Sequence, residues 1–277
     1  MPREVEPKRY SRRSFGSGLF KLAGVLGASA ILKMGRLPNL SRDVAEGGFI
    51  REDLSDKLQG ESFQTIAHNG ANASDNFEVF RRTNCDYIEI DVFTHNGEVY
   101  VGHPDKLAGI PIDSSKSTIG LDNPVRKFSE VAEEVFTDGK KLFIDFKDGP
   151  SVGRVFDFLA EKQMLETSSF TSTAWGNLIE IRNRQGGNCD NLFFTIQNDE
   201  DFEKFIEYDK FPRAPFGVSL DKKSATRENI QKLKARGAIV YVYTVDTPEG
   251  ALNFIGDGAD GITTNNISLM NIKPLQA

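Results

Sequence analysis

The residues best suited to chemistry each lie at the end of a short apolar run. His68 follows the run TIA, Glu89 and Asp91 lie within YIEIDV, His103 comes just after VYV, and Asp145 lies within KLFIDFK. Residues two apart on a strand share a face, so Glu89 and Asp91 point the same way. Acids and imidazoles delivered by apolar strands predict an active site built on a sheet or a barrel.

Three strand-borne carboxylates indicate a metal site. Glu89, Asp91 and Asp145 would repel one another without a cation, and their hard oxygens suit Mg²⁺ or Ca²⁺. We therefore expect one divalent cation there; the alternative is salt bridging of these acids to surface lysines. Lys147 follows Asp145 by two residues and either caps that acid or supplies positive charge to a substrate.

The elements that must position these residues alternate along the chain. Eight apolar runs predict core strands: 65–67, 87–92, 142–146, 170–173, 192–196, 217–220, 239–244 and 261–263. Helical segments fit between most of them: 75–82, 127–135, 152–162, 175–184, 200–208, 225–236 and 248–255. This α/β pattern predicts a (β/α)8 TIM barrel, with the catalytic residues at the carboxyl ends of the first three strands.

An insertion is expected after the second strand. Asn96-Gly97 is a tight-turn signal, so residues 98–102 should fold back on that strand as a hairpin and return His103 to the same rim. The Gly-, Pro- and Ser-rich segment 104–123 indicates a rim loop. The third histidine, His95, adjoins the turn and is predicted to lie on the surface.

A set of short motifs in a fixed order accompanies this pattern. The motifs are His68-Asn69-Gly70, Asp75-Asn76-Phe77, Glu89-Ile90-Asp91, His103-Pro104, Asp145-Phe146-Lys147, Tyr243-Thr244-Val245-Asp246 and Asp260-Gly261-Ile262-Thr263-Thr264-Asn265. In this order they resemble the H-R-G, E-N-T, E-x-D, H-D, E-x-K, W-T-V-[ND] and D-G-I-x-T-[DN] motifs of the glycerophosphodiester phosphodiesterase family, a relative of the sphingomyelinase D-type phospholipases. The resemblance covers residues 65–266 and implies a barrel of the phospholipase C-like phosphodiesterase type.

The resemblance implies a metal-dependent hydrolase that cleaves glycerophosphodiesters to an alcohol and glycerol phosphate. His68 and His103 would serve as acid and base, in an order that the sequence does not assign. Asn69, Lys147 and Tyr243 would contact the substrate, although Asn69 replaces an arginine and Tyr243 a tryptophan.

Two alternatives stay open. The first is a phospholipase D- or sphingomyelinase D-like enzyme acting on lysophospholipids, favoured by the compact segment before Asp145 and by Asp145 itself in place of Glu. The second is a weakly active phosphodiester-binding barrel, suggested by Asn69 and by Pro104 in place of Asp. The single tryptophan, Trp175, follows the fourth strand and is either a substrate-binding rim residue or a packing residue.

The N-terminal residues indicate where the protein acts in the cell and where its barrel domain begins. Ser11-Arg12-Arg13-Ser14-Phe15, an apolar run and Ala28-Ser29-Ala30 predict a twin-arginine signal over residues 1–30, read by the twin-arginine export machinery. We expect the protein to be exported to the periplasm, the cell envelope or the extracellular space. Alternatively, an uncleaved N-terminal segment would anchor it in the membrane. Residues 31–63 are predicted to form a linker and first helix, and residues 64–277 the barrel domain.

Charge and cysteine usage narrow the partners. A net charge of −6 argues mildly against nucleic acid as a partner. The family resemblance implies a small phosphodiester or a lysophospholipid as substrate. The two cysteines, Cys85 and Cys189, lack metal-ligand spacing. We expect both to be small buried hydrophobes, with a bridge between them as the alternative.

Overall fold

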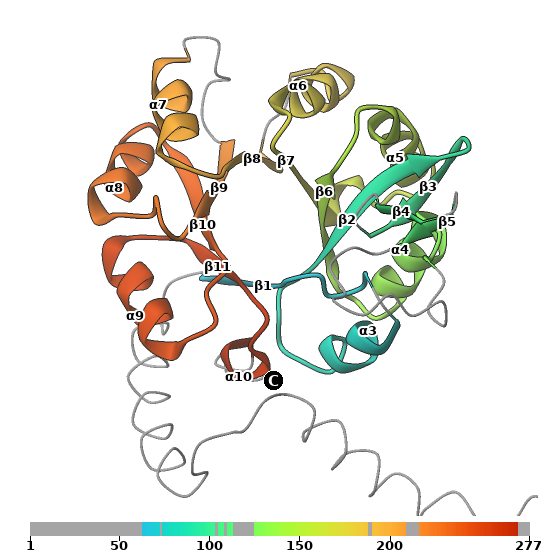
Figure 1. Cartoon of the computed structure of the whole chain (residues 1–277), viewed down its shortest axis with the longest axis horizontal. Coiled ribbons are helices and arrows are strands. Elements are labelled where there is room, and N and C mark those ends of the chain that lie inside the picture. The colour runs from blue at the N-terminus through green and yellow to red at the C-terminus, as the bar shows by residue number, and fades with distance from the viewer. Residues whose placement is uncertain are drawn as a thin grey trace, which may run out of the picture. The chain divides into compact units, whose positions relative to one another are not determined.

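The computed structural model describes residues 63–72, 74–102, 105–107, 110–112, 125–187, 190–208 and 216–270. Within these residues, eight parallel strands form a closed barrel, and helices surround it (Figure 1). The predicted (β/α)8 TIM barrel is confirmed.

Short runs rich in β-branched and aromatic residues form the barrel wall, as their preference for pleated, buried surfaces predicts. The strands are β1 (Gln64–Ala67), β2 (Tyr87–His95), β6 (Lys141–Phe146), β7 (Ser168–Ser172), β8 (Leu192–Ile196), β9 (Phe216–Asp221), β10 (Ala238–Tyr243) and β11 (Gly261–Thr264). Parallel pairing runs around the wall in chain order, and β1 pairs with both β11 and β2, which closes it.

The helices follow the strands and pack on the outside of the barrel. They are α3 (Ser74–Phe80), α4 (Phe128–Thr137), α5 (Pro150–Glu161), α6 (Trp175–Arg184), α7 (Asp199–Glu207), α8 (Arg227–Ala235), α9 (Pro248–Asp257) and the short α10 (Ile267–Met270), with a 3₁₀ turn at Leu165–Thr167. Asn198, Thr226 and Thr247 cap α7, α8 and α9, because each side chain accepts a hydrogen bond from the backbone N–H three residues on.

A layer of large side chains fills the barrel interior beneath the catalytic end. It consists of Ile66, Phe143, Phe193 and Tyr241, with the Phe193 and Tyr241 rings stacked 4.6 Å apart. Gly217 makes room for this layer, since a Cβ there would lie 2.2 Å from the Phe193 ring. The layer forms a solid floor on which the polar residues of the next layer stand.

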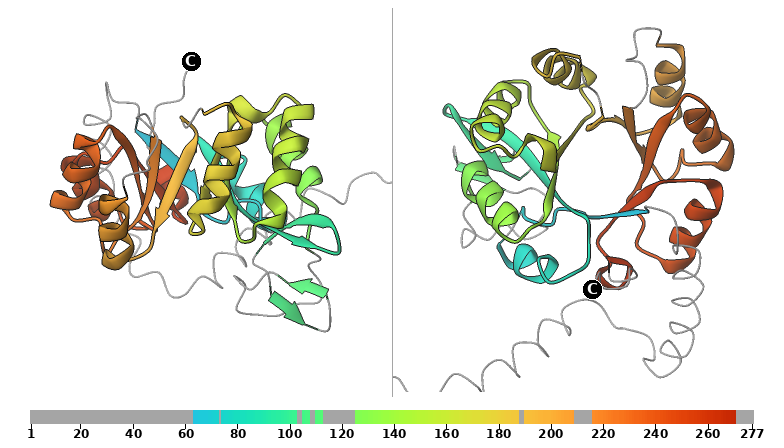
Figure 2. Two further views of the ribbon diagram at one scale, coloured as in Figure 1. Left: turned by 90° about the horizontal axis from the view of Figure 1, so that it is seen from above. Right: turned by 180° about the vertical axis from the view of Figure 1, so that it is seen from behind.

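Two antiparallel ribbons extend the barrel after β2. Strand β3 (Glu98–Val101) pairs back on β2 through a turn in which Asn96 and Gly97 have φ of 49° and 82°, as the Asn-Gly signal predicts. Strands β4 (Asp105–Leu107) and β5 (Ile110–Ile112) pair with each other, so the prediction of a plain loop was wrong for these residues. Figure 2 shows both ribbons reaching out from one side of the barrel.

Several predictions concern residues outside the described part. The expected signal, the N-terminal linker and Cys189 belong there. Cys85 is a free thiol buried in the core, as expected for a small hydrophobe. No helix among the described residues is both long and apolar enough to span a membrane.

Candidate active site

The three acids predicted to bind a metal converge at the carboxyl ends of β2 and β6. Glu89 and Asp91 point into the barrel from alternate positions of β2, and Asp145 lies opposite Asp91 in the parallel register with β6. One carboxylate oxygen from each acid lies within 4.8 Å of the others. Their side chains are well shielded, since Glu89 is 6% and Asp91 2% exposed. This arrangement can hold one divalent cation.

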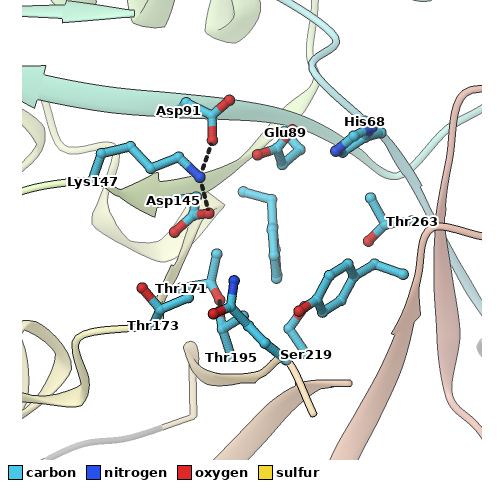
Figure 3. A pocket seen from close by; sticks show the side chains of 13 residues that line it. His68, Glu89, Asp91, Asp145, Lys147, Thr171, Thr173, Thr195, Ser219 and Thr263 are labelled. Atoms are coloured by element: carbon cyan, nitrogen blue, oxygen red, sulfur yellow. Dashed lines mark hydrogen bonds and ion pairs between the residues drawn. The ribbon is translucent and has the colours of Figure 1, made fainter. Parts of the chain in front are cut away.

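Lys147 lies across the acid cluster (Figure 3). Its Nζ is 2.6 Å from Asp91 Oδ1 and 2.6 Å from Asp145 Oδ2. Burial lowers the pKa of Lys147, but the carboxylates of Asp145 and Asp91 outweigh burial and raise it above its ordinary value. The ammonium group is therefore a permanent positive charge within the site.

The Glu89 carboxylate meets an unfavourable electrostatic environment. Burial and the negative charges of Asp91 and Asp145 raise the pKa of Glu89 well above its ordinary value, although Lys147 acts in the opposite sense. The backbone N–H of Asn69 donates a hydrogen bond to Glu89 Oε2 at 2.5 Å. The hydrogen bond thus holds the carboxyl group in place, and either a proton or a bound cation would relieve the repulsion that its charge meets.

Asn69, predicted to bind substrate through its side chain, is placed differently. It has a left-handed backbone with φ of 50°, a conformation that asparagine tolerates better than most residues. Its side-chain Oδ1 accepts a hydrogen bond from Asn72 Nδ2 at 2.6 Å, and the residue does not line the cavity. Asn69 therefore meets the site through its backbone bond to Glu89 and through its side-chain Nδ2, which lies 3.4 Å from each ring nitrogen of His68.

Asn72 is a site residue that sequence reasoning missed. Its buried side chain donates from Nδ2 to Asp91 Oδ2 at 2.7 Å and accepts at Oδ1 from the Asp91 backbone N–H at 3.0 Å. One amide thus fixes both the backbone and the carboxylate of Asp91. A lone asparagine in a turn carries no periodic signal, so nothing in the sequence marked it.

His68 stands at the end of β1, beside Glu89 and away from Lys147 (Figure 3). Its Nδ1 lies 3.0 Å from the side-chain oxygen of Asn265. Asp246 holds Asn265 in turn, accepting from its backbone N–H at 2.8 Å and from its Nδ2 at 3.2 Å. Because an amide oxygen accepts only, Nδ1 carries the proton and Nε2 presents its lone pair. Asp246 and Asn265 occur in motifs quoted above, but no role in orienting His68 was predicted for them.

The cavity that these residues share has a volume of about 170 Å³. It is lined by His68, Glu89, Asp91, Phe143, Asp145, Lys147, Thr171, Thr173, Thr195, Gln197, Ser219, Tyr243 and Thr263. The predicted substrate residue Tyr243 is among them, and its hydroxyl donates to the Ile196 carbonyl at 3.3 Å. Burial, with the charges of Asp221 and Asp145, raises the pKa of Tyr243, so the phenol stays neutral.

Two other histidine and tryptophan positions singled out by the sequence, Trp175 and His95, lie away from the cavity. Trp175 packs edge-on against Phe194 and Phe205 and donates its indole N–H to the Thr195 carbonyl at 3.0 Å, so it does not line the cavity. The packing alternative fits this placement. His103 lies outside the described residues. His95 is half-buried at the β2–β3 turn, beside Tyr100, and is not a cavity residue.

Known proteins resemble this chain in sequence and in structure. The model of the glycerophosphoryl diester phosphodiesterase family matches residues 151–269, which run from α5 to α10. No curated protein matches the chain.

Solved structures share the barrel over most of its length. A glycerophosphodiester phosphodiesterase from Thermotoga maritima is 20% identical, with a TM-score of 0.56, and the match covers 75% of this chain and 95% of that one. One from Agrobacterium tumefaciens is 15% identical, with a TM-score of 0.59 and coverage of 76% and 99%. A phosphodiesterase from Oleispira antarctica, in complex with the product sn-glycerol-3-phosphate, is 15% identical, with a TM-score of 0.58 and coverage of 75% and 94%.

At these identities the structural likeness establishes the fold, and the family match supplies the class of enzyme. The match lies on the half of the barrel that carries Tyr243, Asp246 and Asn265, while the acids and His68 lie on the other half of the same closed wall. The resemblance inferred from the motifs is confirmed, and these matches support a phosphodiesterase hydrolase.

Proposed function

We propose that the protein hydrolyses glycerophosphodiesters to an alcohol and glycerol phosphate, using one divalent cation held by Glu89, Asp91 and Asp145. The observation that carries the proposal is the convergence of three carboxylates, an ammonium group and an imidazole in one cavity at the carboxyl end of the barrel. Glycerol phosphate is the product recorded with the Oleispira antarctica phosphodiesterase, which supports this substrate class.

The donor set fits Mg²⁺ or Ca²⁺. All three ligands are carboxylates, whose oxygens both ions prefer, and the group contains no thiolate or imidazole that would favour a softer metal. A cation bound there offsets the repulsion among the acids and polarises a phosphate oxygen. Lys147 supplies a second positive charge for the phosphate, next to the same carboxylates.

We assign His68 the role of general base. Its Nδ1 proton is donated to Asn265, so the lone pair of Nε2, which lies 3.4 Å from Asn69 Nδ2, can take a proton from the attacking hydroxyl group. That hydroxyl belongs to water or to the glycerol of the substrate. We assign His103, as the second imidazole of the motif set, the role of donating a proton to the leaving alcohol.

A second candidate acts on lysophospholipids in the manner of sphingomyelinase D-type enzymes. Asp145, where glycerophosphodiester phosphodiesterases carry Glu in their E-x-K motif, favours it. The two candidates share the acids and His68 but differ in the substrate that they accept.

Turnover by the full chain separates these candidates. We would offer glycerophosphocholine and lysophosphatidylcholine separately, with EDTA, Mg²⁺ or Ca²⁺, and with His68→Ala as control. The proposal expects metal-dependent release of choline from glycerophosphocholine and loss of this activity in His68→Ala. Activity on the lysolipid alone would favour the second candidate. If the folded protein, supplied with metal, turned over neither substrate, the enzyme assignment would be overturned and a phosphodiester-binding barrel would remain.

Export of the protein is a separate proposal, because residues 1–30 lie outside the described part. It is motivated by Arg12-Arg13 and the apolar run that follows. Cell fractionation should find the wild-type chain outside the cytoplasm and an Arg12→Lys, Arg13→Lys variant within it. Equal distribution of the two would refute the signal.

A further inference from the structure

The turn that follows β6 carries Lys147 into the active site and then starts α5. Lys147 Nζ lies 2.6 Å from Asp91 Oδ1 and 2.6 Å from Asp145 Oδ2, between acids carried by two neighbouring strands (Figure 3). A lysine side chain has a long flexible stem, so the position of its ammonium group depends on how firmly the backbone that bears it is held. The Lys147 backbone has one fixed point at its own N–H, which donates to the Val92 carbonyl at 2.9 Å.

Asp148 supplies a second fixed point. Its Oδ2 accepts a hydrogen bond from the backbone N–H of Thr94 on β2 at 2.7 Å. The bonds of a parallel ladder are evenly spaced, and the register of β2 with β6 would next give this N–H to the Lys147 carbonyl. The chain turns away towards α5 at this point, so the Asp148 carboxylate takes the place of that carbonyl and extends the pairing of the two strands by one bond.

The same carboxylate holds the start of α5. Asp148 Oδ1 accepts a hydrogen bond from the Ser151 backbone N–H at 3.0 Å, the kind of bond by which a capping side chain satisfies the first turn of a helix. Ser151 is fully buried, and its hydroxyl donates back to the Asp148 carbonyl at 3.0 Å. Asp148 is therefore held between α5 and β2, with Lys147 directly before it in the chain.

We propose that Asp148 is a positioning residue for Lys147: by joining β2 to the start of α5, it sets the place of the ammonium group that contacts the substrate phosphate. This inference rests on the proposed function, which gives Lys147 that contact, and extends it to a residue that does not line the cavity. Asp148 also lies outside the motifs quoted above, directly after Asp145-Phe146-Lys147. Its effect on phosphate binding passes through Lys147.

Three variants separate this role from helix capping. Asp148→Ala removes both bonds of the carboxylate. Asp148→Ser returns a capping oxygen to α5, but its shorter side chain does not also reach the Thr94 N–H. Thr226→Ala is the matched control, because it removes the side chain that caps α8 and that does not line the cavity.

Binding of inorganic phosphate to the full chain with Mg²⁺, followed by titration calorimetry, gives the first readout. We expect Asp148→Ala and Asp148→Ser to bind phosphate roughly tenfold more weakly than the wild type, because the ammonium group is displaced. Thr226→Ala should bind phosphate as the wild type does, although urea denaturation should show that it has lost stability. Wild-type affinity in Asp148→Ala, or an equal loss of affinity in Thr226→Ala, would overturn the proposal.

The ammonium signals of lysine in ¹H–¹⁵N NMR give a second readout, which requires neither metal nor turnover. In EDTA, the Lys147 signal, identified by its absence from Lys147→Met, should be visible in the wild type and in Thr226→Ala, because two carboxylates slow its exchange with water. It should be broadened by exchange in Asp148→Ala and Asp148→Ser. An unchanged Lys147 signal in both Asp148 variants would refute the positioning role.

These outcomes distinguish the inference from the proposed function. If the wild type neither bound phosphate nor turned over any diester, the hydrolase would be refuted, and loss of the Lys147 signal in the Asp148 variants would still support the positioning role. If the wild type turned over glycerophosphocholine and the Asp148 variants kept both the signal and the phosphate affinity, the positioning role alone would be refuted.

Discussion

Replacing Glu89 by Gln should stabilise the protein when no divalent cation is present. The carboxylate oxygens of Glu89, Asp91 and Asp145 lie within 4.8 Å of one another, and at an effective dielectric constant of about 20 two charges at that distance repel by roughly 3.5 kcal/mol. Lys147 offsets one of the two repulsions that Glu89 feels, and protonation of Glu89 limits the other. The glutamine, of nearly the same shape, can still accept the Asn69 N–H. We expect the free energy of unfolding to rise by about 1–3 kcal/mol at pH 8.

The raised pKa of Glu89 determines how the stability of the metal-free protein changes with pH. Because the pKa of Glu89 is raised in the folded state, the folded protein binds this proton more tightly than the unfolded chain does. The stability of the metal-free wild type therefore falls as the pH rises from the ordinary Glu value through the raised one. Glu89→Gln lacks this decline, so the two proteins should converge near pH 4 and diverge above it.

Urea denaturation in EDTA between pH 4 and pH 8 measures the difference, with the exposed Glu203→Gln as the matched control. Added Mg²⁺ should then reverse the order, because it binds and stabilises only the wild type. A Glu89→Gln variant less stable than wild type at pH 8 in EDTA, or one stabilised by Mg²⁺ as strongly as wild type, would refute the electrostatic reasoning.

Further variants test single contacts. Asn265→Ala removes the acceptor that orients His68, so kcat should fall roughly 10- to 100-fold with KM nearly unchanged. An unchanged kcat in steady-state kinetics would show that this contact does not contribute to catalysis. Gly217→Ala drives a methyl group into the Phe193 ring and should cost about 1–3 kcal/mol in urea denaturation, so an unchanged midpoint would contradict the packed floor. Trp175→Phe loses one indole hydrogen bond and should lower stability by about 1 kcal/mol without changing KM, whereas a several-fold rise in KM would return this residue to the substrate site.

The barrel was predictable because its signals are local. Each strand is a short apolar run, and the alternation of strands with amphipathic segments leaves few other topologies for a parallel sheet. The Asn96-Gly97 turn is equally local, and the hairpin follows it. Strands β4 and β5 are three residues each, too short for a pattern to reveal, and so they were expected to be loop.

The candidate site was predictable where the alternation of side chains along a strand determines which residues share a face. Glu89 and Asp91 share a face of β2, and register then brings Asp145 opposite Asp91. The supporting amides were not predictable, because their contacts join distant parts of the chain. Asn72 reaches Asp91 across 19 positions and Asn265 reaches His68 across 197.

Trp175 was noticed in the sequence, but the sequence could not decide between its two possible roles. A tryptophan after a barrel strand suits either the rim or the packing between helices, and only the position of its ring decides. Its N–H bonds the Thr195 carbonyl, and its edge contacts Phe194 and Phe205.

Hydrolysis of glycerophosphocholine, followed by ³¹P NMR, tests the central claim most directly. The full chain would be treated with EDTA and then supplied with excess Mg²⁺ or Ca²⁺, beside Asp145→Asn, which removes one ligand charge without changing the shape of the side chain. The account predicts that the diester signal persists in EDTA, is replaced by a monoester or cyclic phosphate signal when the cation is added, and persists throughout in Asp145→Asn. Cleavage that proceeds equally in EDTA, or undiminished in the variant, would contradict the assignment of a cation to this cluster.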